Sequence, residues 1–231
     1  MRIPRSNIVS ENDFIHLIWK CHNDSPLLKD EFIKKRIINL YLKNQKRYQI
    51  KIYAFNILDN HCHFLVRTNN AKDLGDFTRT VHSQISKFIN LRCNRNSQAI
   101  RDRYKSPPIR SMTYMKNLLG YIWLNKYKSN QSQNPFDDKF CSLYHSLRNT
   151  EIGRSLSPLS ELGFDERLDS SIKLLRKLAL SYITEFNKSI LGCYAGKTRL
   201  LKWLLGISTV KYITYNPGNI IKSRRLRLIP R

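Results

Sequence analysis

A tight-turn pair, Asp59-Asn60, separates two short β-forming runs in the first half of the chain. Residues 50–58 alternate weakly in polarity, and the run at residues 61–68 follows the pair at once. Asp and Asn favour turns because their side chains bond nearby backbone groups. We therefore expect a β-hairpin here, and the elements on either side of it decide the fold.

Strand and helix patterns flank the expected hairpin on both sides. Apolar positions three to four residues apart indicate helices, and the clearest stripe lies in the helix just after the hairpin. A later strand contains Pro107-Pro108, so we expect it to be broken or at a sheet edge. The expected elements around the hairpin are a strand at 13–20, a helix at 28–47, a helix at 74–89, a loop at 92–102, a strand at 103–111 and a helix at 113–127.

This order predicts an α+β fold, namely a ferredoxin-like split βαβ antiparallel sheet with helices on one face and one added helix. Residues 128–165 are rich in Ser, Asn, Gln and Pro and are expected to be a connector, whereas residues 166–206 have a helical pattern. Residues 216–231 carry several Lys and Arg and suggest a basic arm. We expect a domain over 1–148 and a helical, basic C-terminal extension of unknown role over 149–231.

The charge of the chain is strongly positive. Its 231 residues include 41 Lys and Arg against 17 Asp and Glu, for a net charge of +24. Such an excess favours a polyanionic partner, and nucleic acid fits best because the basic residues are interleaved with aromatic ones. An anionic membrane surface and a merely solubilising basic surface are the alternatives.

The five cysteines and the length of the apolar runs indicate in which cellular compartment the protein is expected. The cysteine number is odd and no pair has CxxC spacing, which argues against a disulfide framework or a structural zinc module. No apolar run approaches the roughly 20 residues of a membrane span, and the N-terminus lacks the apolar stretch of a signal peptide. We expect a cytoplasmic protein with no membrane partner.

Candidate chemistry begins with His61 and His63 on the second strand of the hairpin. Side chains two apart on a strand point to the same face, so the two imidazoles could bind one divalent metal. This spacing is common by chance, and packing is the alternative. His16, on the first strand, could face the same site, but packing is the favoured interpretation.

Tyr121 and Asn125 form a second candidate pair on the third helix. They are four residues apart and share a helix face. An amide oxygen can bind Mg²⁺ or Mn²⁺, and a phenol beside it is a potential nucleophile. The alternative for Tyr121 is an ordinary half-buried helix tyrosine. Tyr127 lies off that face and is the weaker nucleophile candidate.

Four segments together resemble a known family. The run from Asn60 to Val66 resembles the Asn-His-hydrophobic-His signature of HUH endonucleases. More closely, the chain from about residue 10 to 148 resembles the REP-associated tyrosine transposases, the single-tyrosine branch of that superfamily. The other matching segments, in the family's order, are residues 86–92, 103–106 and 120–125.

The resemblance implies a bacterial, nucleoid-associated enzyme that cuts single-stranded or hairpin DNA and transfers strands in transposition and recombination. His61, His63 and Asn125 would be ligands of Mg²⁺ or Mn²⁺. Tyr121 would attack the scissile phosphate and form a 5′-phosphotyrosine intermediate. The protein would act as a monomer or homodimer, with the active site within one chain or shared between two.

Charge and position suggest a DNA groove, with a solvated loop as the alternative. Its candidate residues are Arg92, Arg95, Arg101, Arg103 and Lys105. Asp59 and Asp102 replace a proline and a glycine of the family motifs, which bears on target recognition more than on chemistry. A catalytically inactive or domesticated DNA-hairpin-binding protein is the second hypothesis. A basic RNA-binding protein ranks last, because the Lys/Arg-Gly-aromatic sheet signature is missing.

Overall fold

The computed structural model describes residues 4–128 and 134–191, together with two short strands near the C-terminus. It divides into two compact units, Met1–Arg176 and Lys177–Arg231. None of the helices in these described ranges is long and apolar enough to cross a membrane. The first unit contains every candidate site residue and is described first.

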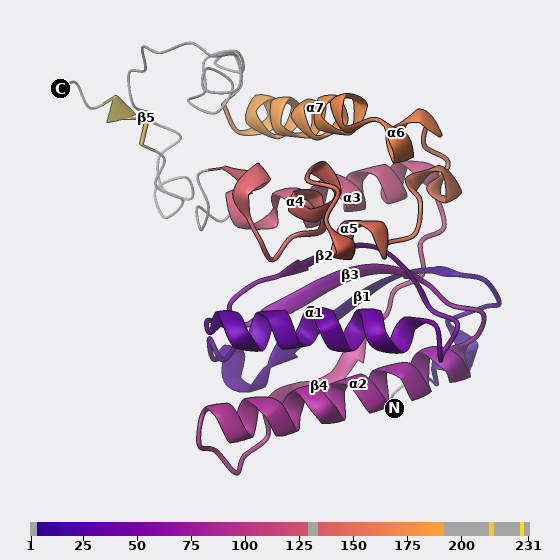
Figure 1. The fold of residues 1–231 in the computed structure, drawn as a ribbon, viewed down its shortest axis with the longest axis vertical. Helices are drawn as coiled ribbons and strands as arrows, with labels where there is room; N and C mark the ends of the chain where they lie inside the picture. The colour runs from indigo at the N-terminus through magenta and orange to yellow at the C-terminus, as the bar shows by residue number, and fades with distance from the viewer. Residues whose placement is uncertain (1–3, 129–133, 192–212, 215–226, 229–231) are drawn as a thin grey trace. The chain divides into compact units, whose positions relative to one another are not determined.

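A four-stranded antiparallel sheet forms the centre of the first unit (Figure 1). The hairpin expected around Asp59-Asn60 is present, and its second strand also pairs with the first strand of the chain. The spatial order β2-β3-β1-β4 is the order of a split βαβ sheet. The strands are β1 (Phe14–Cys21), β2 (Lys51–Ile57), β3 (His61–Arg67) and β4 (Ile100–Lys105).

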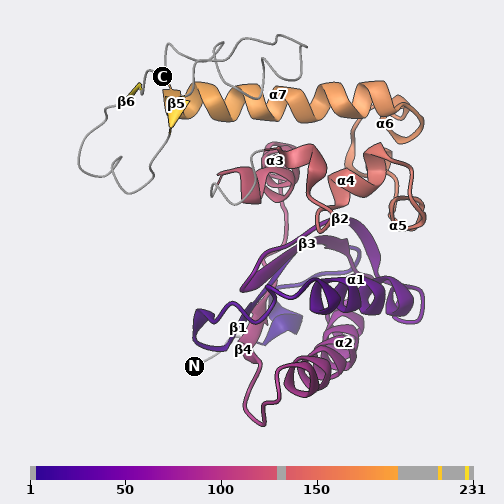
Figure 2. The same ribbon diagram turned by 60° about the vertical axis from the view of Figure 1, so that its left-hand side comes forward.

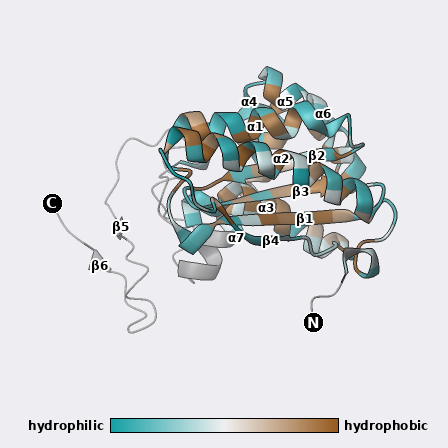
Figure 3. Cartoon of the chain, turned by 90° about the horizontal axis from the view of Figure 1, so that it is seen from below, coloured by the Kyte–Doolittle hydropathy of each residue, from teal (hydrophilic) through white to brown (hydrophobic). Residues whose placement is uncertain are grey.

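Two helices, α1 (Glu31–Gln45) and α2 (Ala71–Arg92), cover one face of this sheet (Figures 1 and 2). Asp30 caps α1 by accepting from the backbone N–H of Phe32, and Asn70 caps α2 by accepting from that of Asp73. The apolar faces of α1 and α2 pack against alternate residues of the strands. Figure 3 shows the central strands β1 and β3 in brown, the colour of hydrophobic residues, along most of their length. The fully buried residues of this core include Leu17, Ile37, Phe64, Phe77 and Val81.

A third helix, α3 (Met112–Lys128), packs on the opposite face of the sheet (Figure 2). The buried amide of Asn56 on β2 donates to the carbonyl of Ile122 at 2.8 Å, which ties the middle of this helix to the sheet. The α+β class and split βαβ sheet expected from the sequence are confirmed. The added helix lies across the sheet from α1 and α2.

Two element boundaries differ from the sequence prediction. The fourth strand, expected at 103–111, begins at Ile100 inside the predicted loop and ends at Lys105, because Pro107-Pro108 supplies no backbone donors. Pairing nevertheless resumes beyond the break, where Pro108 bridges to Ile15. The segment expected as a connector contains short helices instead, because side-chain caps and buried apolar residues stabilise them.

These later elements are short and irregular except for one long helix. Residues 149–176 lie in the first compact unit, while the expected domain boundary after residue 148 remains a prediction. The elements that follow α3 are η3 (Pro135–Asp137), α4 (Ser142–Leu147), α5 (Glu151–Arg154), η4 (Leu159–Leu162), α6 (Arg167–Ser170) and α7 (Ile172–Leu191).

The second unit contains the remainder of α7 and a small antiparallel pair, β5 (Ile213–Thr214) with β6 (Arg227–Leu228). The helical pattern expected over 166–206 is thus present as α6 and α7, and its part beyond residue 191 lies outside the described residues. Most of the expected basic arm at 216–231 also lies outside them.

Candidate active site and metal centre

Three histidines share the sheet face that α3 covers. The register pairs Ile18 with His63 and Lys20 with His61, and directly opposite residues point to one side of a sheet. His16 is two residues from Ile18 and points the same way. The favoured interpretation of His16 as a packing residue is therefore incomplete, because its ring is buried on the site face itself.

His16 and His63 are joined by a hydrogen bond. His16 Nε2 lies 2.9 Å from His63 Nδ1, and the rings stack with centroids 5.1 Å apart. Burial lowers the pKa of His16 to about 4. Burial, and then the nearby His16 and His61, lowers the pKa of His63 to about 2. Both rings are therefore neutral near pH 7, and a neutral imidazole offers one donor and one acceptor nitrogen.

The remaining nitrogen of His63 has an unusual environment. Nε2 is buried and has no hydrogen-bond partner among the described residues. Buried polar atoms are almost always satisfied, so an orphaned imidazole nitrogen calls for a ligand or a role. His63 is only 5% exposed, which leaves little room for solvent to satisfy it.

His61 is held by the residue before it. Its Nδ1 lies 2.6 Å from Asn60 Oδ1, an atom that can only accept, so Nδ1 carries the proton and Nε2 presents a lone pair. Burial, then the positive charge of Lys20, lowers the pKa of His61. The His61 and His63 ring centroids are 4.9 Å apart. Two neutral imidazoles with available lone pairs thus lie side by side.

Helix α3 brings Tyr121 to this pair. The Tyr121 ring centroid lies 5.2 Å from that of His63 and 6.3 Å from that of His16, edge-on to both. The residue is 38% exposed, so part of it is open to an external substrate. Lys128 places its ammonium 5.5 Å from the centre of the same ring.

Asn125 lies one helical turn from Tyr121, on the same face of α3. It is 8% exposed, and its amide nitrogen is buried without a hydrogen-bond partner in the described part of the chain. Rotation of the side-chain amide can turn either its nitrogen or its oxygen to this position. The helix and the facing strand therefore each carry one unsatisfied buried polar atom.

This donor set fits a divalent cation that accepts imidazole nitrogen and amide oxygen, such as Mn²⁺ or Mg²⁺. Among the described residues, no group of three or more His, Cys, Asp or Glu side chains is arranged to hold a metal. A three-ligand centre at this place therefore needs Asn125 to complete the pair formed by His61 and His63.

The structure brings only some of the five candidate DNA-binding residues to the site face. Arg101 lies opposite Lys20, and Lys105 lies opposite Ile18, so these two continue the rows of His61 and His63 across the sheet.

Of the other three candidates, Arg92 is the last residue of α2, Arg95 lies on the segment that joins α2 to β4, and Arg103 lies on β4. Arg92 bonds Asp30 at 2.8 Å and stacks over Phe32, and Arg95 bonds the hydroxyl of Ser97. Arg103 is exposed on β4. Their part in DNA binding remains a prediction.

Three residues at the site were not identified as site residues from the sequence. His16 and Lys20 reach it through the pairing of β1 with β3, which joins residues about 40 or more apart and has no local signal in the sequence. Asn56 pairs with His63 within the β2–β3 hairpin. Tyr127, the weaker nucleophile candidate, lies on the same helix but makes no ring contact with the histidines in the described structure.

The structure matches that of a REP-associated tyrosine transposase bound to a REP hairpin, with a TM-score of 0.50 and 18% identity. The match covers 69% of this chain and 90% of the other, and at this identity it shows the fold alone. A Deinococcus radiodurans protein provisionally described as a transposase gives a TM-score of 0.38 and 14% identity, over 57% of this chain and 98% of the other.

The sequence profile described as "Transposase IS200 like" matches residues 10–134, which is more than half of the chain. The chain therefore belongs to the IS200-like transposase family, and it has a transposase-type, DNA-binding function. The comparison with curated proteins gave no match.

Proposed function

We propose that this protein is a metal-dependent endonuclease and strand transferase that acts on single-stranded or hairpin DNA. The observation that carries the proposal is the meeting of Tyr121 with His63, whose Nε2 is buried and has no hydrogen-bond partner in the described part of the chain. The hairpin substrate is suggested by the REP hairpin bound to the structurally similar transposase.

Each residue has a separate task in this reaction. The Tyr121 oxygen forms a bond to the scissile phosphorus while the bond from phosphorus to the 3′ oxygen breaks. The phenol proton leaves to solvent, and the departing oxygen takes up a proton to become a 3′-OH. The products are a 5′-phosphotyrosine link and a free 3′ end, and reversal of the step with another 3′-OH joins a new strand.

His61, His63 and Asn125 would hold Mg²⁺ or Mn²⁺ beside the phosphate. When bound, the cation would polarise the phosphate oxygens and offset the developing charge. In this arrangement His63 Nδ1–H would donate a hydrogen bond to His16 Nε2, so that His63 Nε2 would keep its lone pair turned to the site. Asn60 does the same for His61.

A labelled DNA hairpin with a single-stranded flank tests the proposal. After incubation with Mn²⁺, a denaturing gel should show DNA covalently attached to the protein. The adduct should be absent in Tyr121→Phe and in EDTA, and present in Tyr127→Phe, a matched change on the same helix. An adduct that survives in Tyr121→Phe but disappears in Tyr127→Phe would assign the nucleophile to Tyr127 and contradict the proposal.

Removal of the ligands provides a second arm. His61→Ala or His63→Ala should abolish cleavage and leave most of the DNA affinity, because that affinity depends on Lys and Arg. Tight binding without an adduct, for the unchanged protein with several metals and hairpins, would instead favour an inactive or domesticated hairpin-binding protein.

A further inference from the structure

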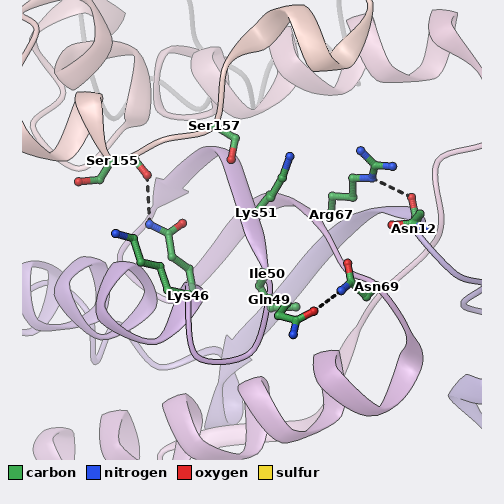
Figure 4. Close-up of a pocket in the computed structure, with 10 residues that line it drawn as sticks. Asn12, Lys46, Gln49, Ile50, Lys51, Arg67, Asn69, Ser155 and Ser157 are labelled. Atoms are coloured by element: carbon green, nitrogen blue, oxygen red, sulfur yellow. Dashed lines mark hydrogen bonds between the residues drawn. The ribbon is translucent and has the colours of Figure 1, made fainter.

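A cationic cavity lies at the other end of strands β2 and β3, away from the histidine pair (Figure 4). Its volume is about 440 Å³. Three of its lining residues are cations, namely Lys46, Lys51 and Arg67, and the others are uncharged. A cavity whose lining charges all have one sign favours an anionic occupant.

The position of two of these cations is energetically unfavourable without an anion. Lys51 and Arg67 are directly opposite each other on β2 and β3, and like charges so placed destabilise an antiparallel pair. Glu161 offsets only part of this charge, because it accepts from Lys51 at 2.8 Å and also from the Tyr53 hydroxyl. No ion pair joins Arg67 to a carboxylate of the described residues.

The side chain of Arg67 is fixed in place rather than free in solvent. Its Nε donates to the backbone carbonyl of Asn12 at 3.2 Å, and its guanidinium stacks over Phe14 at 5.2 Å. The guanidinium also interacts with the Tyr53 hydroxyl and with the charge of Glu161. Its planar fork carries more donors than these contacts use, and such a fork suits a phosphate.

Uncharged hydrogen-bonding groups complete the wall of the cavity. The side chain of Gln49 accepts a hydrogen bond from the amide of Asn69 (Figure 4). The backbone of Gln49 is left-handed, with a φ of +52°. A glycine would adopt this backbone with less strain but would lose that bond. Ser155 and Ser157 approach from the segment after α5, where Gln45 donates to the Ser155 carbonyl.

We infer that this cavity binds a phosphate group of the DNA backbone, as a second DNA contact separate from the histidine pair. Arg67 would bind the phosphate oxygens, with Lys51 and Lys46 adding charge. Arg67 lies four residues from His63 on the same strand and face, which is roughly 13 Å along β3. One DNA molecule can therefore reach both places. The inference rests on the DNA-binding part of the proposed function and not on the tyrosine chemistry.

The test measures the affinity for a labelled hairpin oligonucleotide in EDTA, where no cleavage takes place. Arg67→Gln and Lys46→Gln should each weaken binding, Arg67→Gln by on the order of tenfold, and each should reduce the salt slope of log Kd by about one. Arg79→Gln, a charge-matched change on the exposed face of α2, should have a clearly smaller effect. Glu161→Gln should tighten binding a few-fold, because it removes the carboxylate that competes for Lys51.

Two additional arms separate structural damage and free phosphate from DNA binding. Arg67→Lys keeps the charge and should retain more affinity than Arg67→Gln, while Lys46 is exposed on the surface and its loss should leave thermal melting unchanged. Inorganic phosphate should compete with the oligonucleotide for the unchanged protein more effectively than for Arg67→Gln.

The inference fails if Arg67→Gln and Lys46→Gln weaken binding no more than Arg79→Gln does. It also fails if Glu161→Gln weakens binding, or if phosphate binds the cavity while these substitutions leave DNA affinity unchanged. Because EDTA removes the metal, these outcomes do not depend on whether Tyr121 forms an adduct.

Discussion

At the scale of single residues, His63 depends on His16 for the hydrogen bond at its Nδ1. His16→Ala would leave that N–H buried and unpaired, and the ring would lose its fixed orientation. We expect the affinity for Mn²⁺ to fall by about 10–100-fold, the usual effect of losing a partner that orients a metal ligand. Titration calorimetry with Mn²⁺ in the absence of DNA measures this directly.

A matched substitution separates this effect from loss of stability. His145 is also buried and hydrogen-bonded, but its partners are Thr150 and the Lys139 carbonyl, away from the site. His145→Ala should lower the free energy of unfolding without changing Mn²⁺ affinity. His16→Gln retains an acceptor and should recover part of the loss. Equal Mn²⁺ affinity in His16→Ala and the unchanged protein would show that His16 only packs.

At the scale of elements, the position of α3 decides whether Tyr121 and Asn125 reach the sheet. A buried ion pair near the end of the helix, Lys126 with Asp138 at 2.6 Å, ties it to the segment around Phe140. Lys126→Met would leave the Asp138 carboxylate buried and deprived of this cation. We expect unfolding in urea to show a loss of about 3–5 kcal/mol.

An exposed ion pair of similar length provides the comparison for that prediction. Lys72 and Asp76 are 2.8 Å apart on α2, and the Lys72 side chain is 83% exposed. Lys72→Met should cost much less than Lys126→Met, because solvent already screens an exposed pair. If Lys126→Met costs no more than Lys72→Met, the ion pair does not secure the end of α3.

Much of the element order could be predicted from the sequence because short-range patterns determine it. Alternation placed His61 and His63 on one face, and the helical repeat placed Tyr121 beside Asn125. The pairing of β1 with β3 joins residues 47 apart, as in the His16–His63 bond, and such register has no local signature. Strand β4 was shifted in the prediction, which placed Pro107-Pro108 inside it. The strand ends before these prolines, and it begins in a polar, basic stretch that has no strand pattern.

At the scale of the whole molecule, the buried histidines make stability depend on pH. Burial lowers the pKa of His16 to about 4 and that of His63 to about 2, against about 6.5 for an unfolded chain. Below pH 6.5 the unfolded chain binds protons that the folded chain excludes. The stability contributed by neutral histidines is therefore complete above pH 6.5 and is lost as the pH falls, down to about 4 for His16 and about 2 for His63.

Urea unfolding in EDTA at pH 7 and pH 5 checks this dependence. The free energy of unfolding should be lower at pH 5, and the difference should shrink in His16→Phe, which cannot take up a proton at this position. A free energy of unfolding that is equal or higher at pH 5 would contradict the neutral, buried state assigned to these rings.

The central claim is that Tyr121 becomes covalently attached to DNA beside the histidine pair. Proteolysis of the protein after reaction with hairpin DNA and Mn²⁺, followed by mass spectrometry, identifies the residue that carries a nucleotide. We predict a peptide that contains Tyr121 linked to the 5′-phosphate of the cleaved strand, with no such peptide from His63→Ala. A nucleotide found on Tyr127 or another residue, or an intact adduct in His63→Ala, would contradict the account.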